Sequence, residues 1–294
     1  MYWNISLPSL AQQEITGSDL VLEEILSQNE VYTRYRISYK NGDTSLSGIM
    51  NIPNGEWPYP LIVMNHGYID TSVYTNGRGL KREQDYMARN GFAVIHPDYR
   101  NHALSDKIST EPYDFRQGYT TDVIAAVLAV QNSELEELIN VNASKVWMLG
   151  HSMGAWITQN VLVIRPELVQ AAILYGPVSN AEYDNFERYQ IWNRSRSSLV
   201  QNVVSTYQTP DENPSFWDGV SSRTFFNYVQ APVMIFTGTA DADTPTQWAE
   251  SIYTNLQDLE KRSEIVRFEW EWHEFWPRFW DFMQQSRDFF NTNL

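Results

Sequence analysis

The chain has 294 residues, 43% of them hydrophobic, and it carries a formal net charge of −15. This length allows one large α/β domain or two small ones, and the apolar content can fill a sizeable core. The acidic balance argues against a nucleic-acid partner, because phosphate binding needs clustered lysines and arginines. With no cysteine in the sequence, disulfides, thiolate metal sites and a cysteine nucleophile are excluded.

No apolar run approaches the roughly 20 residues that a membrane-spanning helix needs. The first residues also lack the basic region and the apolar core of a signal peptide. We therefore expect a soluble protein without a transmembrane segment, cytoplasmic by default and extracytoplasmic if a leader has been removed. The sequence does not indicate the oligomeric state.

The first 60 residues predict β structure. Two β-branched and aromatic runs, VYTRYRISYK at 31–40 and TSLSGIMNIP at 44–53, are separated by Asn41-Gly42-Asp43, which is a hairpin turn signal. An antiparallel pair of strands is therefore expected near the start of the chain.

The rest of the chain alternates short apolar runs with helix-like segments, a pattern typical of a parallel sheet covered on both faces. The predicted buried strands are residues 61–67, 91–99, 145–151, 171–176, 232–238 and 265–272. The predicted helices are residues 79–90, 121–131, 153–164, 245–257 and 276–290. Before the fourth helix, Thr244 is expected to be the N-cap, ahead of Pro245 at the first helical position.

One segment interrupts this alternation. Residues 178–230 are longer than any usual connection, and we predict that they form an inserted, mainly helical cap. The expected organisation is a core domain of residues 1–177 and 231–294 with a cap of residues 178–230. The expected fold class is α/β, with a mostly parallel central sheet, helices on both faces and antiparallel N-terminal strands.

The stretch Gly150-His151-Ser152-Met153-Gly154 matches the pattern GxSxG at the junction of a predicted strand and a predicted helix. Its two glycines remove Cβ atoms where the chain reverses sharply, and the reversal holds the serine hydroxyl clear of the sheet. The pentapeptide alone is weak evidence. Its position between strand and helix favours Ser152 as a nucleophile over a plain glycine-flanked turn.

A serine nucleophile needs a base to remove its proton. Of the five histidines, only His273 follows both the serine and a plausible acid, which is the chain order that this turn requires. Asp241 and Asp243 both follow the strand at 232–238 and are candidate acids. We favour Asp241, which comes sooner after the strand, and Asp243 stays open as the alternative. The acid would fix the imidazole tautomer and stabilise the imidazolium.

An acyl-transfer reaction also needs donors for an oxyanion. One expected donor is the backbone N–H of Met153, at the start of the helix after the serine. The second is expected from Tyr68, where Gly67 lets the backbone approach the substrate. We expect no cofactor and no metal, because the sequence shows no HExxH motif and no cluster of histidine and carboxylate.

Other polar and aromatic residues have weaker signals. Arg100 is expected to tie the loop after 91–99 to the sheet by hydrogen bonds, and His151 is expected to pack behind the serine. Three tryptophans are guesses for the walls of an acyl pocket: Trp192, Trp217 and Trp276.

Together these motifs resemble the α/β-hydrolase superfamily, and more narrowly its prolyl-oligopeptidase-like and dienelactone-hydrolase-like esterases and peptidases. The residues that carry the resemblance are NHGY (65–68), HPDYRNHALSD (96–106), LGHSMGAW (149–156), GTADADTP (238–245) and WHEFW (272–276). They occur in the expected order, and the resemblance covers about residues 31–290. The chain departs from the family's glycine-rich DYRGHGxS at residues 98–105, and it has Ala155 where GHSMGG is usual. The resemblance implies an α/β-hydrolase fold.

We therefore expect a serine carboxylesterase for short to medium acyl chains that acts on a small-molecule ester through an acyl-enzyme. Since no β-propeller precedes the domain in this sequence, a free-standing esterase is favoured. The alternative is a prolyl-oligopeptidase-like peptidase or aminoacyl-amide hydrolase with the same triad, in which Glu182, Asp184 or Glu187 would grip the substrate amine. A catalytically silent binding module on the same fold is a third possibility.

Overall fold

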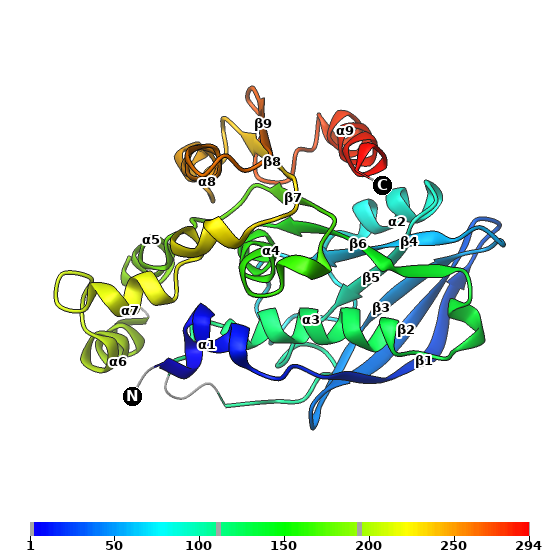
Figure 1. Ribbon diagram of the computed structural model, residues 1–294, viewed down its shortest axis with the longest axis horizontal. Coiled ribbons are helices and arrows are strands. Elements are labelled where there is room, and N and C mark those ends of the chain that lie inside the picture. The colour runs from blue at the N-terminus through cyan, green and yellow to red at the C-terminus, as the bar shows by residue number, and fades with distance from the viewer. Residues whose placement is uncertain (1–2, 110–112, 193–195, 294) are drawn as a thin grey trace.

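The computed structural model describes residues 3–109, 113–192 and 196–293. Within these ranges nine strands form one sheet, in the order β1-β2-β3-β5-β4-β6-β7-β8-β9 (Figure 1). The strands are β1 (Gly17–Gln28), β2 (Tyr32–Asn41), β3 (Thr44–Pro53), β4 (Tyr59–Asn65), β5 (Ala93–Pro97), β6 (Val141–His151), β7 (Ala171–Tyr175), β8 (Val233–Gly238) and β9 (Ser263–Phe268).

The N-terminal part of the sheet is antiparallel. Strands β2 and β3 pair without a register shift from Tyr32 opposite Pro53 to Asn41 opposite Thr44, which confirms the predicted hairpin. Strand β1 lies within the first 60 residues, for which β structure was expected, but it was not predicted as a separate strand. Most of its side chains are exposed, so its sequence shows no alternation of apolar and polar residues, and its pairing with β2 is irregular at three places.

The remaining strands run parallel to one another, as predicted. Strand β9 ends at Phe268, earlier than expected, because the chain turns at Trp270, whose φ is 62°. All parallel strands end at the same edge of the sheet, so the loops after β4, β6, β8 and β9 meet there. That edge carries Tyr68, Ser152, Asp241 and His273.

Helices cover both faces of the sheet. They are α1 (Leu7–Gln12), α2 (Lys81–Arg89), α3 (Gln117–Gln131), α4 (Met153–Ile164), α5 (Glu182–Phe186), α6 (Ser197–Tyr207), α7 (Pro214–Gly219), α8 (Thr246–Asp258) and α9 (Phe279–Thr292). Adjacent side chains of strand β6 point to opposite faces of the sheet. Met148 packs into the core between the sheet and α1, α3, α4 and α8, whereas Trp147 packs into the core between the sheet and α2 and α9. No helix in the described ranges has both the length and the apolar character to cross a membrane.

The segment between β7 and β8 contains α5, the π-helical turn η4 (Glu187–Ile191), α6, α7 and the 3-10 helix η6 (Ser222–Tyr228). Figure 1 shows α5, α6 and α7 beside the sheet, at the end opposite the N-terminal hairpin. These helices share an aromatic cluster that is separate from the two main cores and includes Phe186, Tyr207 and Trp217. The segment is mainly helical, as predicted. Its division from the rest as a cap of residues 178–230 stays a prediction.

Candidate active site

Ser152 lies at the turn between β6 and α4. Its backbone has φ 56° and ψ −120°, a conformation that is costly for a residue with a side chain and that persists only where the surroundings hold it. Its N–H donates a 2.9 Å hydrogen bond to the carbonyl of Tyr175. A Cβ atom on Gly150 would collide with the backbone of Gly154, and one on Gly154 would collide with the backbone of Asn65. Gly150 and Gly154 are therefore required because the backbone of neighbouring segments passes too close to leave room for a Cβ atom.

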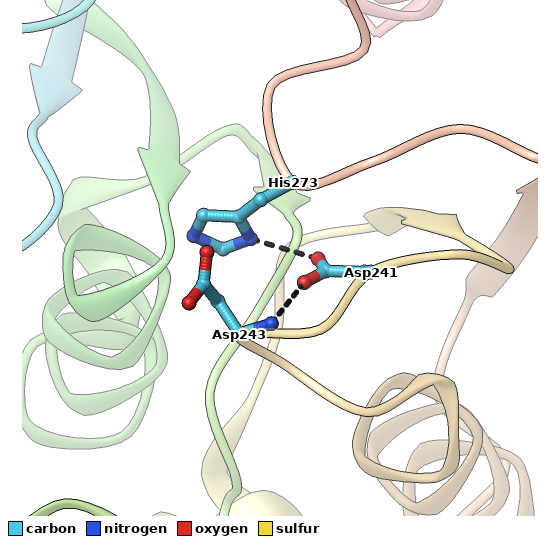
Figure 2. A group of neighbouring side chains, drawn as sticks. All are labelled: Asp241, Asp243 and His273. Carbon is cyan, nitrogen blue, oxygen red and sulfur yellow. Dashed lines mark hydrogen bonds and ion pairs between the residues drawn. The ribbon is translucent and has the colours of Figure 1, made fainter.

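The imidazole of His273 pairs with Asp241. Its Nδ1 lies 2.7 Å from Asp241 Oδ2, and Figure 2 shows this pair together with Asp243. The sequence left open which aspartate contacts the histidine. In the structure it is Asp241 that forms the hydrogen bond with Nδ1 of His273. Asp243 instead donates its backbone N–H to Asp241 Oδ1 at 2.8 Å, while its carboxylate points toward the imidazole ring.

The carboxylate of Asp241 is fully used as an acceptor. Oδ1 accepts the backbone N–H groups of Asp243 and Thr244, both at 2.8 Å, and Oδ2 accepts the Thr244 hydroxyl at 2.7 Å beside the imidazole. Burial alone would raise the pKa of Asp241, but the hydrogen bond and charge of His273 and the two Thr244 donors outweigh it and lower that pKa. An ionised Asp241 stabilises a protonated imidazole.

Thr244 corrects one prediction. Helix α8 begins at Thr246 with Pro245 at its N-cap, and no side chain caps it. The Thr244 hydroxyl is engaged elsewhere, because it donates to Asp241 Oδ2 and lies 3.2 Å from the carbonyl of Gly176. This threonine therefore supports the acid instead of the helix.

His151 lies behind the serine, as expected, and holds the loop of His273. Its Nε2 donates to the His273 carbonyl at 3.1 Å, and its ring packs 4.2 Å from that of Tyr175. Burial and the neighbouring His273 lower the pKa of His151 to about 3. His151 is therefore neutral at physiological pH and acts as a fixed hydrogen-bond donor.

The two expected oxyanion donors flank Ser152. Met153 is the first residue of α4, and Tyr68 follows Gly67 in the loop after β4. A Cβ atom on Gly67 would lie 3.1 Å from Ser152 Cβ, so this loop passes directly against the serine. Among the hydrogen bonds of the described residues, none uses the N–H of Met153 or of Tyr68. Both donors can therefore serve an oxyanion.

Buried hydrogen bonds hold the loops around Tyr68. The ring of His66 stacks on Tyr99 at 4.2 Å between centroids, and Asp98 accepts a 2.7 Å hydrogen bond from the Tyr74 hydroxyl. Arg100 pairs with the fully buried Asp122 at 2.6 Å. It therefore anchors the loop after β5, as expected, but to α3 and not to the sheet. These contacts place the main-chain donors on a rigid support.

Besides a cavity of about 420 Å³ that Gly67, Arg82 and Glu274 also line, Ser152 and His273 open onto a cavity of about 370 Å³. The other lining residues are Tyr68, Phe115, Arg116, Met153, Trp156, Val178, Glu182, Asn185, Tyr189, Gln190, Arg196 and Asp243. No hydrogen bond joins the Ser152 hydroxyl to His273 among those of the described residues, which is common for such pairs without substrate. The guess about three tryptophans is wrong: Trp192 and Trp276 are exposed, Trp217 packs in the aromatic cluster, and Trp156 lines the cavity instead.

Folding also forms a group of potential metal ligands, which was not expected from the sequence. Ligand atoms of Asp241, Asp243 and His273 all lie within 4.8 Å of one another, so a cluster of histidine and carboxylates exists after all. The oxygens of Asp241 already accept four hydrogen bonds, and Nδ1 of His273 is one of the donors. A metal ion would have to displace these bonds. The donor set fits a fixed acid–imidazole pair better than a metal site.

A family profile for the alpha/beta hydrolase fold matches residues 60–196. The strand order and the turn at Ser152 agree with this match. The chain has the α/β-hydrolase fold. This confirms the family resemblance and the fold class predicted from the sequence.

The proteins to which this chain is similar include esterases and a peptidase. "Probable acetylxylan esterase A" of Neosartorya fischeri is 31% identical over 122 residues, which are 37% of this chain and 30% of that protein. The match thus spans less than a third of this curated relative. Acetyl xylan esterase 1 from Thermoanaerobacterium sp. superposes with a TM-score of 0.71 at 16% identity, covering 97% of this chain and 91% of that one. Pyrococcus horikoshii acylaminoacyl peptidase gives 0.68 at 19% identity, covering 89% and 41%.

Proposed function

We propose that the protein is a serine carboxylesterase for short to medium acyl chains, with Ser152 as nucleophile, His273 as base and Asp241 as the acid. The observation that carries this proposal is the 2.7 Å pair of Asp241 and His273 at the cavity that also exposes the strained Ser152. A carboxylate, an imidazole and a serine from three separate loops form the set that nucleophilic acyl transfer requires.

In the proposed reaction, the Ser152 oxygen attacks the ester carbonyl while His273 Nε2 takes the hydroxyl proton. Asp241 holds Nδ1 and stabilises the resulting imidazolium. The N–H groups of Met153 and Tyr68 stabilise the oxyanion. His273 then protonates the leaving alcohol, and a water molecule, deprotonated by the same imidazole, releases the acid from the acyl-enzyme.

Amide hydrolysis is the second candidate, because it needs the same groups. The carboxyl group of Glu182 lines the cavity and could accept a substrate amine, whereas Asp184 and Glu187 do not line it. The esterase is favoured because the curated relative is named an acetylxylan esterase and the alcohol of an ester leaves more easily than an amine. Rates on matched aminoacyl 4-nitroanilides and 4-nitrophenyl esters discriminate the two.

The test is turnover of 4-nitrophenyl butyrate by Ser152→Ala. We expect a loss of at least about 10³-fold in kcat, because triad serines act as a unit with their base. Ser205→Ala removes an exposed hydroxyl of α6 that does not line the cavity and should retain full activity. Equal circular dichroism and melting curves would show that both variants fold. Turnover by Ser152→Ala at the normal rate would end the proposal.

A further inference from the structure

Two arginines line the cavity next to Ser152 without a carboxylate partner. Neither Arg116 nor Arg196 forms an ion pair within the described part of the chain, although the whole sequence has 36 acidic and only 21 basic residues. Arg100, the other arginine of this region, is neutralised by Asp122. Leaving guanidinium groups unpaired beside a nucleophile is costly unless another group binds them.

A strained turn fixes the position of Arg116. Phe115 and Arg116 both have positive φ, 52° and 59°, and the N–H of Arg116 donates to Asp114 at 2.9 Å. The guanidinium of Arg116 lies over the ring of Tyr68, 5.0 Å from its centroid. Its side chain makes no hydrogen bond among those of the described residues. Consecutive non-glycine residues in this conformation concentrate at functional sites.

Arg196 approaches Tyr68 from a different direction. Its Nη1 donates to Gln190 Oε1 at 2.6 Å, and its Nη2 lies 3.5 Å from the Tyr68 hydroxyl. The two arginines therefore bracket Tyr68, one at the ring face and one at the hydroxyl. The backbone N–H of this tyrosine is the proposed oxyanion donor, and both arginines line the same cavity as Ser152.

The carboxyl groups of the cavity do not cancel this charge. Asp243 lies at the His273 side. Glu182 is buried, and this burial raises its pKa to about 8 against the opposing effects of Asn185, Arg116 and Trp156. Glu182 is therefore mostly protonated at neutral pH. Asp114 and Asp70 are near enough to Arg116 and Arg196 to interact with their charges, but among the described residues neither forms an ion pair with them. The end of the cavity near Tyr68 is positive.

We propose that the preferred substrates are esters that carry a carboxylate, which binds to Arg116 and Arg196 while the ester carbonyl lies against Ser152. This inference rests on the esterase function proposed above. Guanidinium groups present planar, paired donors that match a carboxylate. The carboxylate can belong to the acyl part or to the alcohol part of the ester, and the experiment separates the two.

Two ester series test the acyl and alcohol parts. For the acyl part, 4-nitrophenyl adipate, heptanoate and 6-aminohexanoate present a negative, a neutral and a positive chain end. For the alcohol part, 4-acetoxybenzoate is compared with its methyl ester. We expect kcat/KM to favour the carboxylate in at least one series, for adipate over heptanoate by about tenfold or more. Equal values in both series, or a preference for the amine, would overturn the inference.

Variants assign the preference to the arginines. Arg116→Gln and Arg196→Gln should each lower the ratio of charged to neutral kcat/KM by about tenfold, and Arg116→Lys should lower it less. Arg223→Gln removes an exposed arginine that does not line the cavity and should leave the ratio unchanged. An unchanged ratio in both cavity variants would also overturn the inference. Turnover that depends on Ser152 without any carboxylate preference would refute this inference alone, whereas turnover that survives Ser152→Ala would refute the esterase.

Discussion

Charged groups at the edge of the sheet and at the Tyr68 end of the cavity differ in how many of their hydrogen-bonding and ionic partners come from the protein. At the edge, the carboxylate of Asp241 accepts four hydrogen bonds and is held in one orientation. A short distance away, the guanidinium of Arg116 stacks on Tyr68 and forms no ion pair with a carboxylate of the described residues. A group whose partners are all in the protein is prepared for a fixed chemical task, and a group without them is prepared for a ligand. We therefore assign Asp241 to the proposed catalytic reaction and Arg116 to the proposed recognition of the substrate.

The largest expected effect comes from replacing the aspartate that bonds to the imidazole. Asp241→Asn should lower kcat by about 10⁴-fold, because an amide can no longer hold the required tautomer or stabilise the imidazolium. Asp243→Asn is the matched control: it keeps the backbone N–H that donates to Asp241 and should cause a much smaller decrease. Steady-state kinetics on 4-nitrophenyl butyrate measures both. Equal losses would mean that the acid is wrongly assigned.

A smaller effect is expected from Arg188, which joins η4 to the loop of Asp241. Its Nε donates to the carbonyl of Asp243 at 2.9 Å and its Nη2 donates to the carbonyl of Ala242, so η4 holds the loop of Asp241. Arg188→Ala should let this loop move and lower kcat by up to about a hundredfold. Arg188→Lys should recover part of the loss, and Arg223→Ala should cause none. A change in KM alone would argue against this positioning role.

The smallest expected effect is a pH dependence of stability. The pKa of Glu182 is raised to about 8 in the folded protein, so the folded state binds a proton that the unfolded chain releases above about pH 4.5. The contribution of Glu182 to the free energy of unfolding therefore falls as pH rises from about 5 to 8, by at most about 1.4 kcal/mol per pH unit. The difference between wild type and Glu182→Gln in the slope of the free energy of unfolding against pH measures this contribution.

Urea unfolding at several pH values provides the measurement. The buried His66, His96 and His151, whose pKa values are lowered to about 3, impose the opposite slope below about pH 6.5. They are present in both proteins and cancel in the difference between wild type and variant. Identical slopes for the two proteins would show that Glu182 has an ordinary pKa.

Much of the sheet and the positions of the proposed triad could be predicted, because each signal is local. Buried parallel strands are continuous apolar runs, and chemistry-bearing residues follow their ends. Strand β1 escaped prediction as a separate strand because its side chains are mostly exposed. Thr244 resembled a helix cap, and only the folded loop shows that its hydroxyl goes to Asp241.

The cavity walls depend on tertiary contacts that no local pattern encodes. Trp217 looked like a wall residue, yet it packs against aromatic residues from the loop before α3 and from α5, α6 and α7. The approach of Arg116 and Arg196 to Tyr68 joins residues 48 and 128 positions from that tyrosine.

Covalent labelling with a fluorophosphonate tests the central claim, activation of Ser152 by His273, most directly. Peptide mass spectrometry should find one adduct, on Ser152. Labelling should be absent in Ser152→Ala and slower by orders of magnitude in His273→Ala. An adduct on a different residue, or equal labelling rates in His273→Ala and wild type, would contradict the account.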